Sequence, residues 1–142
     1  MAASALFFLL AASSHNFALA SDEDQAAPAE KKTFVVTAYY KPLPGQSRYL
    51  CGNYKSEKRM NGEGLKTSSG TAPHEGTVAA DPRVLPYGTK VNIPGYGEGK
   101  VEDTGGAIKG NRIDVFMGEG ESALEKSVAW GKKKVEIEIT PV

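Results

Sequence analysis

The sequence predicts a compact β-barrel with little helix. Short runs rich in β-branched and aromatic residues recur along the chain, and glycine and proline turn residues separate them. The last run, residues 134–140, alternates valine and isoleucine with glutamate and threonine, so one of its faces suits a core and the other suits water. Together the runs give about six strands and one helix in a folded part of roughly 110 residues, which is typical of a small barrel.

The elements follow from composition and from the turns that bound them. The first strand is predicted at TFVVTAYY, residues 33–40, and residues 134–140 close the set. The strands between them are expected at residues 76–80, 89–93, 99–103 and 111–117. Ser122 and Glu125 have the spacing of a capping box, and Gly131 suits a helix C-terminus, so a helix is expected between them. Residues 41–71 are weakly patterned and are predicted to form a long loop, with a short piece of structure around residues 49–54.

The N-terminal region is predicted to direct secretion. Residues 1–20 have an apolar centre, contain no Asp, Glu, Lys or Arg and end in Ala-Leu-Ala, as a secretory signal with an A-x-A cleavage site does. Residues 21–32 are charged and alanine-rich and are expected to be a flexible tether. The folded domain then spans residues 33–142, with no stable membrane insertion after cleavage.

Composition excludes several classes of function. The 17 basic and 17 acidic side chains leave no net charge to attract nucleic acid. After signal cleavage the chain keeps one cysteine, Cys51, and one histidine, His74, which is too few for a Cys/His zinc site. No metal, no cofactor and a monomer are expected. A catalytic pair of Cys51 and His74 is permitted but not indicated, and an ordinary thiol is the simpler interpretation.

The chemistry is expected around two aspartates, Asp103 and Asp114, which bracket a glycine-rich stretch. Period-two alternation places Asp114 on the same strand face as Arg112 and Phe116, opposite an apolar face. Two plainer interpretations stay open: a solvated face with an ordinary ion pair, and a turn capped by Asp103. Asp81, which precedes a proline, also has the simpler interpretation of a turn opener.

Three segments, residues 78–83, 85–91 and 102–116, resemble the three-aspartate (3D) domain in their order and spacing. This domain is the C-terminal barrel of the membrane-bound lytic transglycosylase A family and occurs in many small secreted cell-wall proteins. The resemblance runs from about residue 33 to residue 139. It implies a mainly β fold, a six-stranded double-psi β-barrel with one or two short helices, and peptidoglycan glycan strands as the substrate class.

The resemblance also assigns roles to residues. Asp114 matches the position of the catalytic acid, and Asp103 is the second catalytic candidate. The glycines between them allow a tight turn, so that both carboxylates line one groove. Candidate substrate-binding residues are Asp81, Tyr39, Tyr40, Gly105, Gly106, Lys109 and Arg112.

The function implied is cleavage of peptidoglycan by a lytic transglycosylase-type mechanism, in a secreted protein of the periplasm or cell wall. Two alternatives stay open. An inverting hydrolase requires two carboxyl groups about 6.5 to 9.5 Å apart, which Asp103 and Asp114 would supply. A non-catalytic glycan-binding or wall-loosening module of expansin type would use the same groove. Larger family members form their cleft with a second domain, so here the loop at residues 41–71 is expected to serve as the wall.

Overall fold

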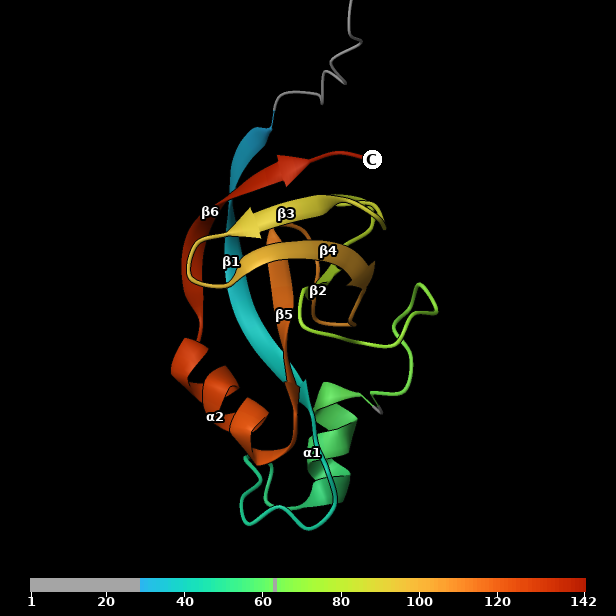
Figure 1. Cartoon of the computed structure of the whole chain (residues 1–142), viewed down its shortest axis with the longest axis vertical. Coiled ribbons are helices and arrows are strands. Elements are labelled where there is room, and N and C mark those ends of the chain that lie inside the picture. The colour runs from blue at the N-terminus through green and yellow to red at the C-terminus, as the bar shows by residue number, and fades with distance from the viewer. Residues whose placement is uncertain (1–28, 63) are drawn as a thin grey trace, which may run out of the picture.

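The protein folds as a closed six-stranded mixed β-barrel with two helices, as a computed structural model of residues 29–62 and 64–142 shows (Figure 1). The predicted signal and residues 21–28 of the predicted tether lie outside the described residues. The strands are β1 (Glu30–Lys41), β2 (Thr77–Ala80), β3 (Lys90–Ile93), β4 (Gly97–Asp103), β5 (Arg112–Glu119) and β6 (Lys133–Thr140). The helices are α1 (Tyr54–Asn61) and α2 (Gly120–Trp130). The predicted mainly β, six-stranded barrel is therefore confirmed.

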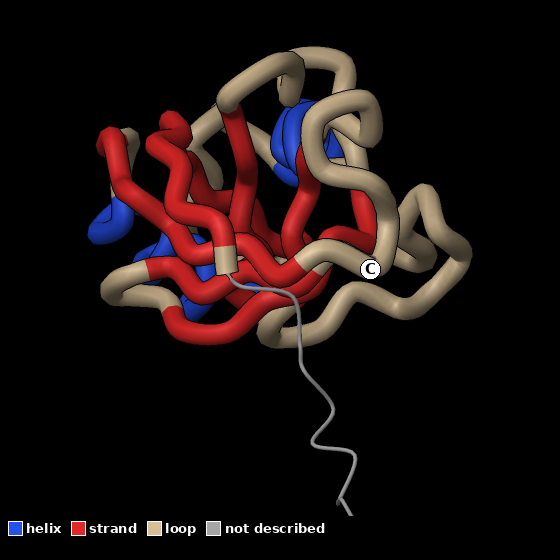
Figure 2. Tube along the Cα trace, turned by 90° about the horizontal axis from the view of Figure 1, so that it is seen from above, coloured by secondary structure: helices blue, strands red, loops and turns tan. Residues whose placement is uncertain are grey.

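The strands follow the order β1-β5-β2-β4-β3-β6 around the barrel, and β6 pairs with β1 to close it. Two neighbouring pairs, β1 with β5 and β2 with β4, are parallel, and the others are antiparallel. In Figure 1 both helices lie at the lower end, on either side of the lower parts of β1 and β5. Glu30 pairs with Ile139, so the start of β1 and the C-terminal end meet at the opposite end, which faces the viewer in Figure 2.

The barrel interior is filled by the alternate residues that the sequence pattern predicts. Ile113 and Val115 of β5 and Ile137 and Ile139 of β6 are buried, while the intervening positions turn outward or are less buried. Burying each side chain of this size contributes about 1.5–3 kcal/mol. The full inner cluster contains Phe34, Val36, Val78, Ala80, Leu85, Val91, Ile93, Val101, Ile113, Val115, Ile137 and Ile139.

Two boundaries differ from the sequence-based expectation. β1 begins at Glu30 rather than at residue 33, because residues 30–32 pair with Ile139, Glu138 and Ile137 of β6. Residues 30–32 therefore belong to the barrel and not to the tether. α2 begins at Gly120, and Glu119 precedes it without a side-chain cap, so the predicted capping box at Ser122 does not form.

The segment predicted as a long loop contains α1. The Asn53 side chain caps this helix by accepting a hydrogen bond of 3.0 Å from the Ser56 backbone. Glu57 attaches the helix to the barrel, since its buried carboxylate accepts the Tyr40 hydroxyl at 2.7 Å and the Cys51 backbone N–H at 2.7 Å. Neither helix of the described part is long and apolar enough to cross a bilayer.

Candidate active site

The two predicted catalytic aspartates lie in one row across the outer surface of the barrel. Ala79 of β2 is the register partner of Asp114 on β5 and also of Asp103 on β4. Thr37 of β1 extends the row, because it pairs with Asp114. Paired residues share a sheet face, and the core position of Ile113 shows that the row faces outward. Strands lie about 4.8 Å apart, so the Cα atoms of Asp103 and Asp114 are about 10 Å apart.

A β-bulge sets the direction of Asp103. Val78 pairs with Val101, and the next residue of β2, Ala79, pairs with Asp103, so Glu102 is an extra residue in β4. With unbroken alternation, Asp103 would share its face with Val101, which is buried in the core. The bulge therefore keeps the Asp103 carboxylate on the outer surface beside Asp114.

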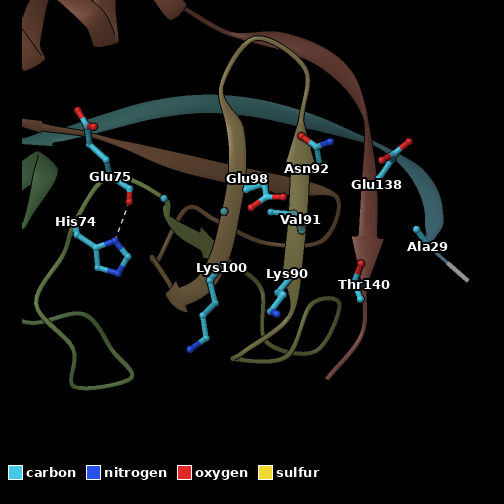
Figure 3. A pocket seen from close by; sticks show the side chains of 12 residues that line it. Ala29, His74, Glu75, Lys90, Val91, Asn92, Glu98, Lys100, Glu138 and Thr140 are labelled. Carbon is cyan, nitrogen blue, oxygen red and sulfur yellow. Dashed lines mark hydrogen bonds between the residues drawn. The ribbon is translucent and has the colours of Figure 1, made fainter. Parts of the chain in front are cut away.

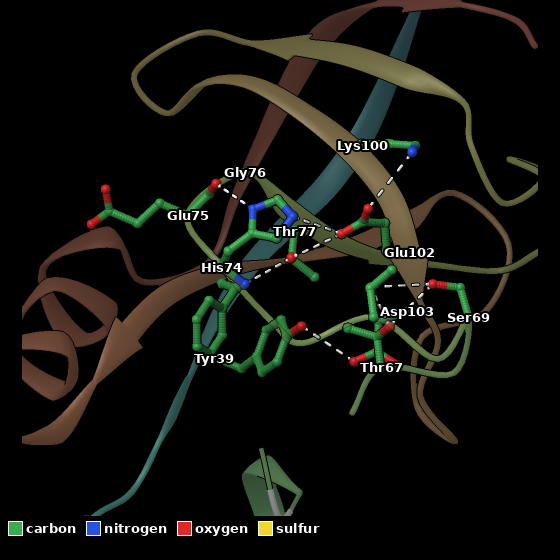
Figure 4. Close-up of polar contacts among 12 residues, drawn as sticks. Tyr39, Thr67, Ser69, His74, Glu75, Gly76, Thr77, Lys100, Glu102 and Asp103 are labelled. Atoms are coloured by element: carbon green, nitrogen blue, oxygen red, sulfur yellow. Dashed lines mark hydrogen bonds and ion pairs between the residues drawn. The ribbon is translucent and has the colours of Figure 1, made fainter. Parts of the chain in front are cut away.

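Four donors surround the Asp103 carboxylate. Its Oδ1 accepts from the Ser68 backbone N–H at 3.0 Å, the Ser68 hydroxyl at 2.8 Å and the Thr104 backbone N–H at 2.9 Å. Its Oδ2 accepts the Tyr39 hydroxyl at 3.2 Å (Figure 4). An ionised carboxylate only accepts hydrogen bonds, and this environment supplies only donors.

Asp114 has a different environment. Burial raises the pKa of its carboxyl group to about 6, and the negative charge of Asp103 acts in the same direction. The Thr37 hydroxyl and the Arg112 guanidinium oppose this shift only in part. Asp114 thus has a raised pKa beside the charge of Asp103, which suits a proton donor.

Three buried polar atoms near this row lack a hydrogen-bond partner within the described residues. They are Asp114 Oδ1, Arg112 Nε and Thr104 Oγ1. Thr104 follows Asp103 directly, and Arg112 precedes Asp114 by two residues on the same strand face. Buried polar atoms are normally paired, so an acceptor, an N–H donor and a hydroxyl left free in one region suit a polar ligand.

The two predicted tyrosines lie on opposite faces of β1. The Tyr39 ring contacts Phe116 with ring centroids 5.2 Å apart, and burial raises the pKa of its hydroxyl far above the ordinary value. Tyr40 is buried instead in a small cluster with Ala123 and Leu124 of α2. The structure therefore places Tyr39 beside Asp103, whereas Tyr40 packs against α2.

Asp81 is buried, and both its oxygens are used within the chain. Arg83 donates to it through Nε at 3.0 Å, Nη2 at 2.8 Å and the backbone at 3.1 Å, and the Gly110 N–H donates at 3.0 Å. The Arg83 side chain, with the Gly110 amide, holds the pKa of Asp81 well below its usual range. Asp81 thereby fixes the loop that connects Asp103 to Asp114.

The remaining candidates lie in that connecting loop. Gly105 accepts a turn hydrogen bond of 3.1 Å from Ile108, and an added Cβ at Gly105 would lie 3.0 Å from the Ile108 side chain. Gly106 and Lys109 are exposed. Gly105 thus serves the close turn, while Lys109 is free to reach a ligand from the loop surface.

Sequence reasoning missed the residues that line the other side of Asp103. The Ser69 N–H donates to the Glu102 backbone at 3.0 Å. The buried Glu102 carboxylate accepts the Thr77 hydroxyl at 3.2 Å and lies 3.1 Å from His74 Nε2 (Figure 4). These contacts hold the segment from Ser68 to His74 against β4. A serine pair in an unpatterned loop gives no signal of this role, and the bulge at Glu102 gives none either.

Other hollows lie around the barrel. One of about 500 Å³ lies along β3 and β4, and its lining includes the charged residues Lys90, Lys100 and Glu98 (Figure 3). Another of about 340 Å³ is lined by Leu65, His74 and residues of β5. Within the described ranges no cluster of three metal-ligating side chains occurs.

Comparison with known proteins shows which family part of the barrel resembles. Residues 76–140 match the family described as the 3D domain, which confirms the predicted resemblance to that domain. Two matching relatives come from Bacillus subtilis strain 168. The putative cell wall shaping protein YabE is 49% identical over 67 residues, 47% of this chain and 16% of the relative. The cell wall-binding protein YocH is 46% identical over 67 residues, 47% of this chain and 22% of the relative.

The chain thus matches less than a quarter of each relative's length. Among solved structures, the lytic transglycosylase MltA from Escherichia coli matches with 23% identity and a TM-score of 0.47. That match covers 53% of this chain and 27% of MltA. MltA with bound chitohexaose matches with 22% identity and a TM-score of 0.47, over 55% and 28% of the two chains.

Proposed function

We propose that this protein is a secreted cell-wall enzyme that cleaves the glycan strands of peptidoglycan by a lytic transglycosylase-type mechanism. The 3D domain and the names of the two cell-wall relatives support the substrate class. One observation carries the chemistry: Asp114 is a partly buried carboxyl group with a pKa of about 6 and a buried, unpartnered oxygen, in the same row as Asp103.

In the proposed reaction, protonated Asp114 donates its proton to the glycosidic oxygen as the bond from that oxygen to C1 breaks. The C6 hydroxyl of the same sugar then attacks C1 and closes an anhydro ring. Its proton passes to the Asp114 carboxylate, which restores the acid, so no water is consumed. Asp103, held by four donors, stabilises the positive charge that develops at the sugar ring.

The polar atoms near the row that have no partner within the described residues indicate the substrate-binding roles. Arg112 Nε and Thr104 Oγ1 donate to hydroxyl or acetamido oxygens of the sugar that Asp114 cleaves. Tyr39 offers its ring edge beside this sugar while its hydroxyl fixes Asp103. Lys109 and the exposed Gly106 contact the strand from the loop between β4 and β5.

A second candidate function is binding without cleavage. The observation that favours it is the position of Ser68, whose two hydrogen bonds keep the segment around it on the Asp103 carboxylate. In that case the row would recognise glycan hydroxyl groups, and Asp114 would act as a hydrogen-bonding group rather than as an acid.

Digestion of purified peptidoglycan distinguishes these functions. Soluble products are separated and their masses are measured by mass spectrometry. Asp114→Asn is the test variant, and Glu136→Gln, at an exposed position on β6, is the matched control. Anhydromuropeptides from the unchanged and control proteins, but not from Asp114→Asn, support the proposal. Products with reducing ends indicate a hydrolase, and binding to the insoluble wall without products indicates the binding module.

A further inference from the structure

A further hollow, of about 620 Å³, has Phe116 in its lining, two residues along β5 from Asp114. It lies between the turn that joins β3 to β4 and the C-terminal part of α2, and its walls include Tyr96, Phe116 and Trp130. We propose that this hollow is a binding site for an additional, uncharged sugar residue of the glycan on which Asp114 acts. The inference rests on the proposed function and extends the site along the same strand of substrate.

Phe116 connects the hollow to the candidate active site. It follows Asp114 by two residues on the same face of β5, which is about 7 Å along the strand. Its ring contacts Tyr39, which in turn bonds to Asp103, and the same Phe116 lines the hollow. A glycan held at Asp114 therefore reaches the hollow with a neighbouring sugar residue, without leaving the barrel surface.

The walls of the hollow are rigid. The Tyr96 hydroxyl accepts the Gly76 N–H at 2.9 Å and donates to the Phe116 carbonyl at 2.9 Å, which fixes the ring. The Tyr96 and Trp130 rings meet edge to face, with centroids 6.2 Å apart and an angle of 75°. A pyranose presents an apolar face of C–H groups and a polar rim, which suits preformed aromatic walls beside polar groups.

The polar groups of the hollow select an uncharged ligand. The Trp130 Nε1–H is buried and has no hydrogen-bond partner in the part of the chain that the structure describes, so it offers one donor to a ligand oxygen. The rim carries two lysines and two glutamates, which give no excess of either sign. Lys133 lies 3.6 Å from the centre of the Trp130 ring, and Lys126 pairs with Glu75 at 3.4 Å. A neutral sugar with hydroxyl or acetamido oxygens fits this arrangement better than an anion.

The sequence contains one tryptophan, so the hollow has its own spectroscopic probe. We suggest titrating the protein with a soluble β-1,4-linked N-acetylglucosamine hexamer, following Trp130 fluorescence and its indole N–H resonance. Both signals are expected to change saturably. Trp130→Phe, which keeps an aromatic ring but removes the donor, is expected to raise the Kd for the hexamer about three- to tenfold. The matched control, Tyr87→Phe, changes an exposed ring that does not line the hollow and is expected to leave the Kd unchanged.

The outcomes separate this inference from the proposed function. If calorimetry shows hexamer binding while both Trp130 signals stay constant, the hollow is not part of the site, although the proposed function stands. An unchanged Kd in a folded Trp130→Phe protein leads to the same conclusion. If the unchanged protein binds neither the hexamer nor peptidoglycan, the proposed function fails together with the inference. The signals of the unchanged protein decide the question even if the variant does not fold.

Discussion

The hydroxyl of Tyr39 donates a hydrogen bond of 3.2 Å to Asp103, which ties β1 to the carboxylate at the end of β4. The next residue, Tyr40, points to the other side of the strand and donates to Glu57 at 2.7 Å. The two adjacent tyrosines thus have different roles. Tyr39 orients a residue of the candidate site, and Tyr40 attaches α1 to the barrel.

Phenylalanine at each tyrosine position tests this division. Tyr40→Phe leaves Oε1 of the buried Glu57 carboxylate without its donor, so we expect the free energy of unfolding to fall by about 1–3 kcal/mol, with little change in glycan binding or cleavage. Tyr39→Phe is expected to lower the rate at which soluble glycan products form several-fold, with a smaller loss of stability. Urea unfolding and peptidoglycan digestion measure the two effects. Equal effects of both variants on stability, with none on the glycan, would remove Tyr39 from the site.

Asp114→Asn tests the general acid directly. The amide has nearly the shape of the carboxyl group but cannot donate a proton to the glycosidic oxygen, so turnover is expected to fall about 100- to 10,000-fold. Glycan binding and the folded structure are expected to persist, since the amide still forms hydrogen bonds. Release of anhydromuropeptides at the parental rate by a folded variant would exclude Asp114 as the acid and make Asp103 the next candidate.

The pH profile of the reaction follows from the state of Asp114. Because burial raises the pKa of Asp114 to about 6, the protonated form that donates is lost as the pH rises through that value. We therefore expect the turnover of bound substrate to decline above about pH 6. Digestion rates at saturating peptidoglycan across pH 4–9 check this. A rate that keeps rising to pH 9 contradicts an acid with this pKa.

The raised pKa of Asp114 also predicts how the stability of the protein changes with pH. An unfolded chain loses the Asp114 proton near pH 4, whereas the folded protein keeps it to about pH 6, so ionisation of Asp114 costs stability over this interval. Well above pH 6, Asp114 is ionised in the folded protein as well, and the loss of stability reaches its full value. Asp114→Asn is therefore expected to raise the free energy of unfolding at pH 8 by on the order of 2 kcal/mol, and to change it little at pH 4. Denaturant unfolding at the two pH values measures the difference, and a variant that is less stable at pH 8 contradicts it.

Asp81→Asn is expected to act on stability rather than chemistry. The amide cannot accept both guanidinium contacts of Arg83 and also the Gly110 N–H, so the loop between β4 and β5 loosens. We expect a lower melting temperature and only a modest fall in turnover. Arg83→Gln serves as a companion variant, because it removes the same contact from the other side. A loss of turnover as large as that of Asp114→Asn, in a protein of unchanged stability, would assign Asp81 to the chemistry.

The sequence predicted the strands well, because alternation directly records which side chains enter the barrel, as Ile137 and Ile139 show. It failed at α1, whose position depends on a contact between Glu57 and Tyr40 that no local pattern reveals. It also could not show the bulge at Glu102, because strict alternation would have turned Asp103 inward. The sequence proposed the two aspartates, but the difference between their surroundings depends on burial and on Ser68, a partner 35 residues from Asp103 in the chain.

The pairing of Glu30 with Ile139 has a practical consequence for attaching this domain to other molecules. Both ends of the barrel leave from one rim, and Tyr39 lies about nine residues further along β1, roughly 30 Å away. A bead, dye or fused protein joined at either end therefore stays clear of the aspartates. A display format that anchors the domain by one end leaves the surface that carries Asp103 and Asp114 accessible to an insoluble wall fragment.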